Sequence, residues 1–137
     1  MASTNIERVG HPPAESFAEQ TLELAEVELP EIETLPQQNV GGRIIDFVVR
    51  NTETAKRLLI EVKYGIPYNA DAMSRLVAQL QAAAQEAQQT GGGVMLWTLK
   101  TPTAAQLAAL EAELPNIEVQ IVSGVENLYT FVTNYLK

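Results

Sequence analysis

The chain has no cysteine and a single histidine. Without cysteine it can form neither a disulfide framework nor a thiolate metal site. His11, between Gly10 and Pro12, is expected to be a terminal residue rather than a general base, and no serine–histidine pair suits a hydrolase. The glycines at 91–93 precede a predicted strand, so they do not form a phosphate-binding loop that opens a helix. Carboxylates are therefore the candidates for chemistry.

Long apolar runs are also missing. No run approaches the roughly 20 apolar residues that span a bilayer, and residues 1–16 lack the cationic and apolar regions of a signal peptide. We therefore expect a soluble chain with no membrane partner. A length of 137 residues suits one compact domain, so a single domain over 1–137 is predicted.

Positive charge is scarce overall but unevenly distributed. The net charge is −8, which argues against a nucleic-acid partner when taken as an average. Residues 1–42 carry eight glutamates and one arginine, whereas residues 43–100 carry seven Lys or Arg against five Asp or Glu, a net of +2. The acidity lies at the two ends, and the middle segment is mildly basic.

Hydrophobic patterning predicts helices and strands in the order α-β-β-β-α-β-α-β-α. The segments are a helix over 14–27, a short edge strand within 28–42, a hairpin of strands 43–50 and 57–64, a helix over 69–90, a strand over 93–99, a helix from 101, a strand over 117–123 and a helix over 124–137. This order predicts an α/β fold with a mixed sheet and helices on both faces.

Helix ends and faces can be predicted as well. Asn69 or Asp71 is expected to begin the helix at 69–90, and Thr101 is expected to cap the next helix, with Pro102 at its first position. The predicted buried side of the first helix comprises Phe17, Thr21, Leu24 and Ala25.

Acidic residues interrupt both strands of the predicted hairpin, "RIIDFVVR" and "RLLIEVKY". Since side chains alternate along a strand, Glu61 and Lys63 share one face. Asp46 faces Glu61 only if paired residue numbers have an odd sum such as 107; an even sum turns Asp46 to the other face. The alternative is a solvent-facing strand with a cross-strand ion pair.

Two facing carboxylates repel each other strongly enough to require a proton on one of them or a cation between them. Mg²⁺ suits such a site because it binds a few carboxylate oxygens and keeps several waters. The carbonyl of Val62 offers one more oxygen, and Lys63 can act on a water or on phosphate charge.

Asp46, fourteen residues, then Glu61-Val62-Lys63, on consecutive strands between two helices, resembles the core of the PD-(D/E)XK, or restriction-endonuclease-like, nuclease superfamily. The resemblance covers about residues 12–100 and leaves a C-terminal helix-strand-helix extension. The chain departs from the pattern at Ile45, where the family often has proline. The resemblance implies that Asp46 and Glu61 bind Mg²⁺ or Mn²⁺, that Lys63 assists the attacking water, and that no organic cofactor takes part in phosphodiester hydrolysis.

The resemblance also implies residues on both flanking helices. Glu19, or alternatively Glu15, would reach the metal from the first helix, although a solvated acidic face also explains these glutamates. Gln79, one turn after Arg75, would position the phosphate or the water from the second helix. Docking of DNA is expected on the surface bearing Arg43, Arg50, Lys56, Arg57, Lys63 and Arg75. Lys100, at a strand end, is interpreted as a snorkelling lysine.

The expected function is metal-dependent hydrolysis of DNA. A small nuclease domain without a sequence-reading module is similar to toxin domains that bacteria deliver into competitors, which implies delivery into a target cell and a cognate immunity protein. Two alternatives remain: a noncatalytic acidic binding or immunity-type protein, and an RNase or DNA-repair nuclease on the same fold.

Overall fold

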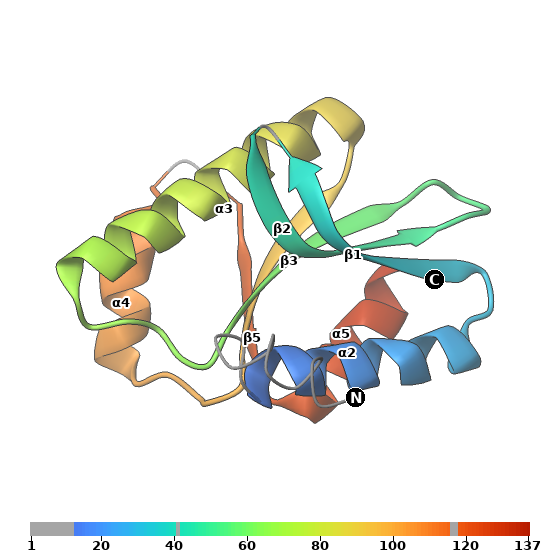
Figure 1. The fold of residues 1–137 in the computed structure, drawn as a ribbon, viewed down its shortest axis with the longest axis horizontal. Helices are drawn as coiled ribbons and strands as arrows, with labels where there is room; N and C mark the ends of the chain where they lie inside the picture. Colours follow the sequence, from blue (N-terminus) through green and yellow to red (C-terminus); the bar gives the residue numbers. More distant parts are fainter. Residues whose placement is uncertain (1–12, 41, 116–117) are drawn as a thin grey trace, which may run out of the picture.

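The computed structural model describes residues 13–40, 42–115 and 118–137 and has the predicted order of elements (Figure 1). The elements are α2 (Pro13–Glu28), β1 (Ile32–Val40), β2 (Arg43–Asn51), β3 (Arg57–Lys63), α3 (Ala70–Thr90), β4 (Gly93–Thr98), α4 (Ala104–Ala112), β5 (Gln120–Ser123) and α5 (Val125–Tyr135). His11 lies outside the described residues.

The five strands form one sheet in the order β1-β2-β3-β4-β5. The β1–β2 and β2–β3 pairs are antiparallel, whereas β3–β4 and β4–β5 are parallel. The predicted mixed α/β sheet is therefore confirmed. β1 is longer than the short strand expected, because Pro36 is tolerated on an edge strand, where one side of the backbone needs no partner.

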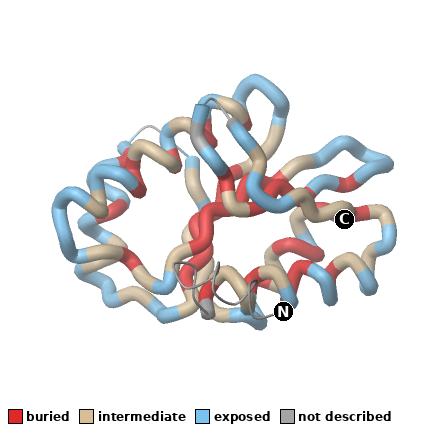
Figure 2. The backbone as a smooth tube through the Cα atoms, viewed as in Figure 1, coloured by how far each residue is buried: buried red, intermediate tan, exposed pale blue. Residues whose placement is uncertain are grey.

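Two hydrophobic clusters sandwich the sheet. One joins it to α2 and α5, and the other joins it to α3 and α4. Figure 2 shows the buried central strands between these layers, which Figure 1 shows on opposite sides of the sheet. In the described part of the chain no helix combines the length and apolarity that a bilayer crossing requires.

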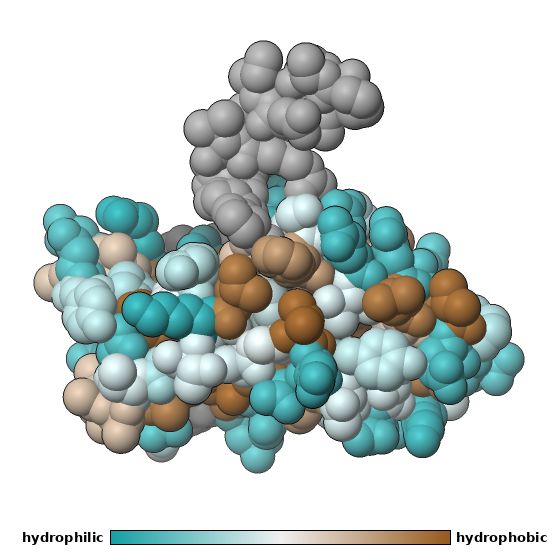
Figure 3. All heavy atoms as spheres, turned by 90° about the horizontal axis from the view of Figure 1, so that it is seen from below, coloured by the Kyte–Doolittle hydropathy of each residue, from teal (hydrophilic) through white to brown (hydrophobic). Residues whose placement is uncertain are grey.

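The buried face of α2 differs from the predicted one. Phe17 is 45% exposed and Leu24 is 62% exposed, so the prediction was wrong for both. The face that packs inward consists mainly of small residues, Ala14, Ala18, Thr21, Leu22 and Ala25. Small side chains allow the helix backbone to approach the sheet and α5 closely, and apolar side chains remain on the outer surface seen in Figure 3.

α3 starts where the sequence analysis predicted, but α4 does not. Asn69 caps α3 by accepting hydrogen bonds from the N–H groups of Asp71 and Ala72. α4 begins two residues later than expected, because Thr103 and Gln106 form a reciprocal capping box. Thr101 and Pro102 therefore lie in the loop before α4.

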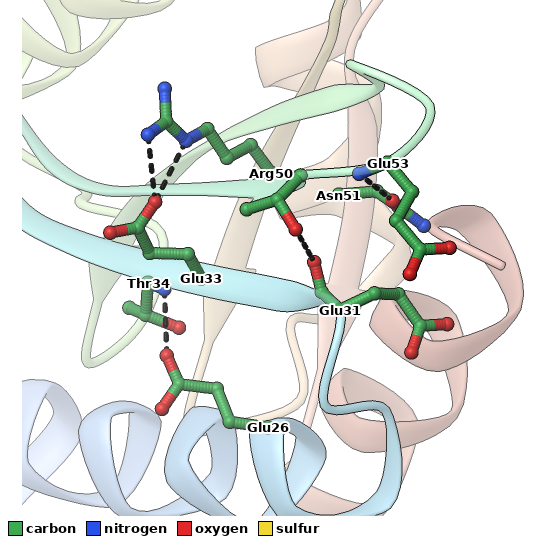
Figure 4. Close-up of polar contacts among 8 residues, drawn as sticks. Glu26, Glu31, Glu33, Thr34, Arg50, Asn51 and Glu53 are labelled. Atoms are coloured by element: carbon green, nitrogen blue, oxygen red, sulfur yellow. Dashed lines mark hydrogen bonds and ion pairs between the residues drawn. The ribbon is translucent and has the colours of Figure 1, made fainter.

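The turn between β2 and β3 is fixed to the C-terminal helix by Asn51, which is 2% exposed. Its Nδ2 donates to the Leu136 carbonyl over 2.7 Å, and its Oδ1 accepts from the N–H groups of Glu53 and Thr54. Figure 4 shows the contact with Glu53. One buried amide thus satisfies three backbone groups from two distant segments.

Asn51→Ala is expected to lower the free energy of unfolding by about 2–3 kcal/mol, because it leaves the Leu136 carbonyl without its donor. Urea denaturation of the variant beside wild type measures the loss. Glu53→Ala, which changes an exposed side chain in the same turn, is the control and should have little effect. Equal stability of the two variants would contradict the anchoring role of Asn51.

Candidate active site

The register of the β2–β3 hairpin is the odd one required for a shared site. The paired residues Phe47–Ile60, Val48–Leu59, Val49–Leu58 and Arg50–Arg57 all have numbers that sum to 107. Of the two parities that the sequence left open, the structure has the odd one. Asp46 and Glu61 line one cavity, and the charge of Asp46 acts on the Glu61 carboxyl.

The two strands separate just beyond the Phe47–Ile60 pair, where the ladder ends. Beyond that pair the Asp46 side chain, rather than a backbone carbonyl of β2, contacts β3. Its Oδ2 accepts a 2.8 Å hydrogen bond from the Val62 N–H. On the other side of β2, Gln37 has a φ of 53° and interrupts the β1–β2 pairing between Pro36 and Gln38. This local break aims Asp46 toward β3 and opens a cavity at the end of the hairpin.

The cavity has a volume of about 510 Å³. Its lining includes the side chains of Asp46, Glu61, Lys63 and Gln79, so sheet and α3 residues predicted from sequence are brought together. Glu15 of α2 also lines it, but Glu19 does not. Glu15 and Glu19 are four residues apart and share a face of α2, so Glu15, the alternative named from the sequence, lies at the cavity one turn before Glu19. A role of either glutamate as a metal ligand stays a prediction.

Glu61 is a buried ionisable residue of the cavity: only 3% of its side chain is exposed. Its pKa rises to about 8, first through loss of hydration on burial and second through the negative charge of Asp46. The ammonium of Lys63 opposes this rise, with Nζ 3.6 Å from Glu61 Oε2. At neutral pH Glu61 therefore favours the protonated form in the absence of another cation.

Two buried oxygens of residues that line this cavity have no hydrogen-bond donor among the residues that the structure describes. They are Oε1 of Glu61 and Oε1 of Gln79. A buried acceptor without a partner is unfavourable, and a bound cation or the water around it supplies what these atoms lack. Carboxylate, amide and backbone carbonyl oxygens are also the ligands that hard divalent cations prefer.

The donor set suits Mg²⁺ or Mn²⁺, which keep several waters, better than a metal whose ligands all come from protein side chains. Within residues 13–40, 42–115 and 118–137, no group of three or more His, Cys, Asp and Glu side chains could hold an ion. Mg²⁺ commonly uses only one or two carboxylates and completes its coordination with water and phosphate. Asp46 and Glu61, with the oxygens of Val62 and Gln79, match that pattern.

The predicted basic docking surface is divided in the structure. Arg50, Lys56 and Arg57 lie at the turn end of the hairpin, away from Asp46, and Arg50 is paired with Glu33 at 2.8 Å (Figure 4). The reason is that a hairpin has its turn at one end of its two strands and its open end at the other. Arg50 and Arg57 are therefore removed from the open end that carries the candidate site.

Sequence reasoning did not identify three residues beside the cavity. Tyr64, Tyr68 and Lys100 border a neighbouring cavity that also contains Arg75. The run "EVKYG" carried the signal for Tyr64, but exposure of the two tyrosines and proximity of Lys100 depend on the loop after β3. Lys100 was interpreted only as a strand end.

No protein-family model matches the chain, and neither does any curated protein. Among solved structures, Can2 from Sulfobacillus thermosulfidooxidans, in complex with cyclic tetra-adenylate, superposes with a TM-score of 0.61 and 13% identity. The match covers 89% of this chain and 36% of Can2. At this identity the likeness shows a shared fold.

A second similar structure is SfsA from Pyrococcus furiosus in complex with Ca²⁺. Its TM-score is 0.51 and its identity is 14%, over 80% of this chain and 54% of SfsA. The chain therefore spans roughly a third to a half of these two proteins. Both likenesses agree with a restriction-endonuclease-like arrangement of sheet and helices.

Proposed function

We propose that this chain is a metal-dependent nuclease that hydrolyses phosphodiester bonds of DNA. The observation that carries the proposal is the convergence of Asp46, Glu61 and Lys63 on one cavity, with an unpartnered buried oxygen on Glu61. The motif's resemblance to the PD-(D/E)XK nucleases supports it, as do the fold shared with Can2 and SfsA and the Ca²⁺ bound to SfsA.

Four residues would hold the metal: Asp46 and Glu61 through carboxylate oxygens, Val62 through its carbonyl and Gln79 through its amide oxygen. Bound there, a divalent cation lowers the pKa of water and stabilises charge on phosphate. The hydrogen bond from the Val62 N–H fixes one Asp46 oxygen and leaves the other for the cavity. Glu15 would reach the same space from α2.

Lys63 is the residue placed to act on the reacting groups. It follows Glu61 on the same face of β3, and its side chain is 35% exposed, so the ammonium can meet both the cavity and an incoming phosphate. There it would orient the attacking water and offset the negative charge that develops on phosphate. Water oxygen bonds to phosphorus as one sugar oxygen leaves, and the products are a phosphomonoester and an alcohol.

We further propose that the domain serves as a toxin delivered between competing bacteria and is inhibited by a cognate immunity protein. Support comes from the resemblance to small toxin nuclease domains and from the absence of a recognisable sequence-reading module. Low sequence specificity follows from the same proposal.

Incubation with supercoiled plasmid tests the nuclease proposal. We expect nicking or linearisation in Mg²⁺ or Mn²⁺, none in EDTA, and none with Asp46→Asn, which keeps an acceptor for the Val62 N–H. A parallel RNA substrate separates DNase from RNase activity. Plasmid that stays supercoiled with every metal would end the DNase proposal.

A net charge of −8 favours a second candidate, a noncatalytic acidic binding or immunity-type protein. That function predicts no metal uptake and no effect of Asp46→Asn beyond stability. Calorimetric titration with Mn²⁺ distinguishes the two candidates without relying on cleavage.

A further inference from the structure

A second cavity, of about 470 Å³, adjoins the candidate active site. The two cavities share Lys63, Tyr64 and Gln79 in their linings. It lies beyond the carboxyl ends of the parallel strands β3 and β4, where open α/β sheets commonly bind ligands. Its volume is within the roughly 300–1,000 Å³ of small-molecule sites.

The charge of this cavity is opposite to that of the whole chain. The described part of the chain contributes Lys63, Arg75 and Lys100 to its lining and no Asp or Glu. Arg75 and Lys100 are exposed, and neither forms an ion pair with any residue that the structure describes. Arg75 and Lys100, together with Lys63, which also contacts Glu61, form a local region of positive charge that suits an anion in an acidic protein.

Two tyrosines at the same cavity are held in exposed positions. Tyr64 is 59% exposed and Tyr68 is 84% exposed. Between them Ile66 is buried, and its carbonyl accepts a hydrogen bond from Gln106. Asn69, the cap of α3, follows Tyr68 directly, so the loop that carries the ring is anchored on both sides.

Backbone pairing fixes one tyrosine next to one cation. The Lys100 N–H donates to the Tyr64 carbonyl over 2.8 Å, which continues the β3–β4 pairing past the strand ends. Tyr64 and Lys100 both line the cavity, so an aromatic ring and an ammonium group are available there together. This combination is typical of surfaces that bind nucleic-acid strands by stacking and phosphate contact.

We propose that this cavity binds an unpaired nucleotide of single-stranded nucleic acid next to the cleaved bond. Tyr64 and Tyr68 stack on bases, and Arg75 and Lys100 contact phosphates. The inference rests on the proposed nuclease function, since it names the form of the substrate. Base faces in a duplex are covered by their neighbours, so exposed tyrosines gain a stacking partner only from an unpaired strand.

The small extent of the basic region also favours one strand. The three cations of the cavity gather at one end of the β3–β4 pair, whereas Arg50 and Arg57 lie at the far end of the hairpin. A duplex presents phosphates on two strands and calls for a broader basic surface. The region suits a few consecutive phosphates of a single strand.

Fluorescence anisotropy in EDTA tests the inference without cleavage. The probes are labelled oligothymidylate, labelled oligouridylate and a DNA duplex of equal length, all at one salt concentration. We expect the single strands to bind at least about tenfold more tightly than the duplex, and Tyr68→Ala to weaken single-strand binding by roughly tenfold. The two single-stranded probes separate DNA from RNA.

Matched variants identify the contacts. Tyr68→Phe keeps the ring and should bind as wild type does, and Lys100→Gln should weaken binding whereas Lys56→Gln, at the hairpin turn, should not. Equal or tighter duplex binding, no binding to single strands, or no effect of Tyr68→Ala would overturn the inference.

The outcomes separate this inference from the nuclease proposal. Tyr68-dependent binding of single strands without cleavage in any metal would support the inference and sink the nuclease proposal. Plasmid cleavage by Tyr68→Ala at the wild-type rate, with no single-strand preference, would support the nuclease proposal and overturn this inference.

Discussion

Replacing Lys63 by methionine is expected to lower the rate of phosphodiester cleavage by roughly 10²–10⁴-fold and to leave binding of a divalent cation in place. The expected loss is large because, among the residues that the structure describes, Lys63 is the only Lys or Arg in the lining of the cavity that holds Asp46 and Glu61. Methionine keeps an unbranched apolar stem at a partly exposed position, so the fold should persist. Single-turnover cleavage measures the rate, and Mn²⁺ calorimetry measures the metal affinity.

Lys63→Arg separates two roles of the side chain. Arginine keeps the charge but cannot give up its proton, so it retains activity if Lys63 stabilises phosphate charge and loses activity if Lys63 takes a proton from water. Lys56→Met, remote from both cavities, is the control for removing one cation. Cleavage by Lys63→Met at the wild-type rate would contradict a catalytic role for Lys63.

The hairpin was predictable because it depends on local sequence, whereas its register was left open between an odd and an even sum. Two apolar strands joined by the polar connection at 51–56 form a hairpin, and the parity of the pairing decides which side chains share a face. The element order was predictable for a similar reason, since each helix and strand carries its own periodicity. Asn69 marked the start of α3 through its own side-chain hydrogen bonds.

The features that the sequence did not reveal depend on tertiary packing. Helical periodicity favoured large apolar residues for the inner face of α2, but close packing selected the alanines instead. Which glutamate of α2 reaches the cavity depends on the position of the helix along the sheet, and Glu15 rather than Glu19 is among the lining residues. The separation of β2 from β3 at Asp46 likewise depends on a hydrogen bond between a side chain and the neighbouring strand.

The second cavity could not be predicted from the sequence, again because it depends on tertiary structure. Tyr64 and Lys100 are far apart in the chain and meet only because the β3–β4 pairing extends beyond the strands. A strand-end lysine and a loop tyrosine are ordinary when considered alone. They are candidates for binding substrate because both line a cavity that adjoins the one containing Glu61.

Stability of the metal-free protein is expected to depend on pH through Glu61. Its carboxyl has a pKa of about 8 in the folded chain, against an ordinary value of 4.5. Between these values the folded state binds more protons than the unfolded state, so the free energy of unfolding falls as pH rises. This contribution is complete below about pH 4.5 and is lost above about pH 8, with a total of up to about 4 kcal/mol.

Glu61→Gln should remove this dependence, because glutamine resembles the protonated acid and has no proton to lose. Urea denaturation in EDTA at acidic and alkaline pH should show the variant gaining on wild type by about 2–4 kcal/mol as pH rises. Taking the difference between the two proteins cancels the titration of other groups. Parallel pH profiles would contradict burial of an ionisable Glu61.

A divalent cation should reverse the order of stability at alkaline pH. A cation that binds the folded chain stabilises it by mass action, and at Glu61 it favours the ionised form that burial opposes. Mg²⁺ or Mn²⁺ is therefore expected to raise the melting temperature of wild type more at pH 8 than at pH 6, and to do little for Glu61→Gln. Equal shifts for both proteins would show that the ion binds elsewhere and that this cavity is not the metal site.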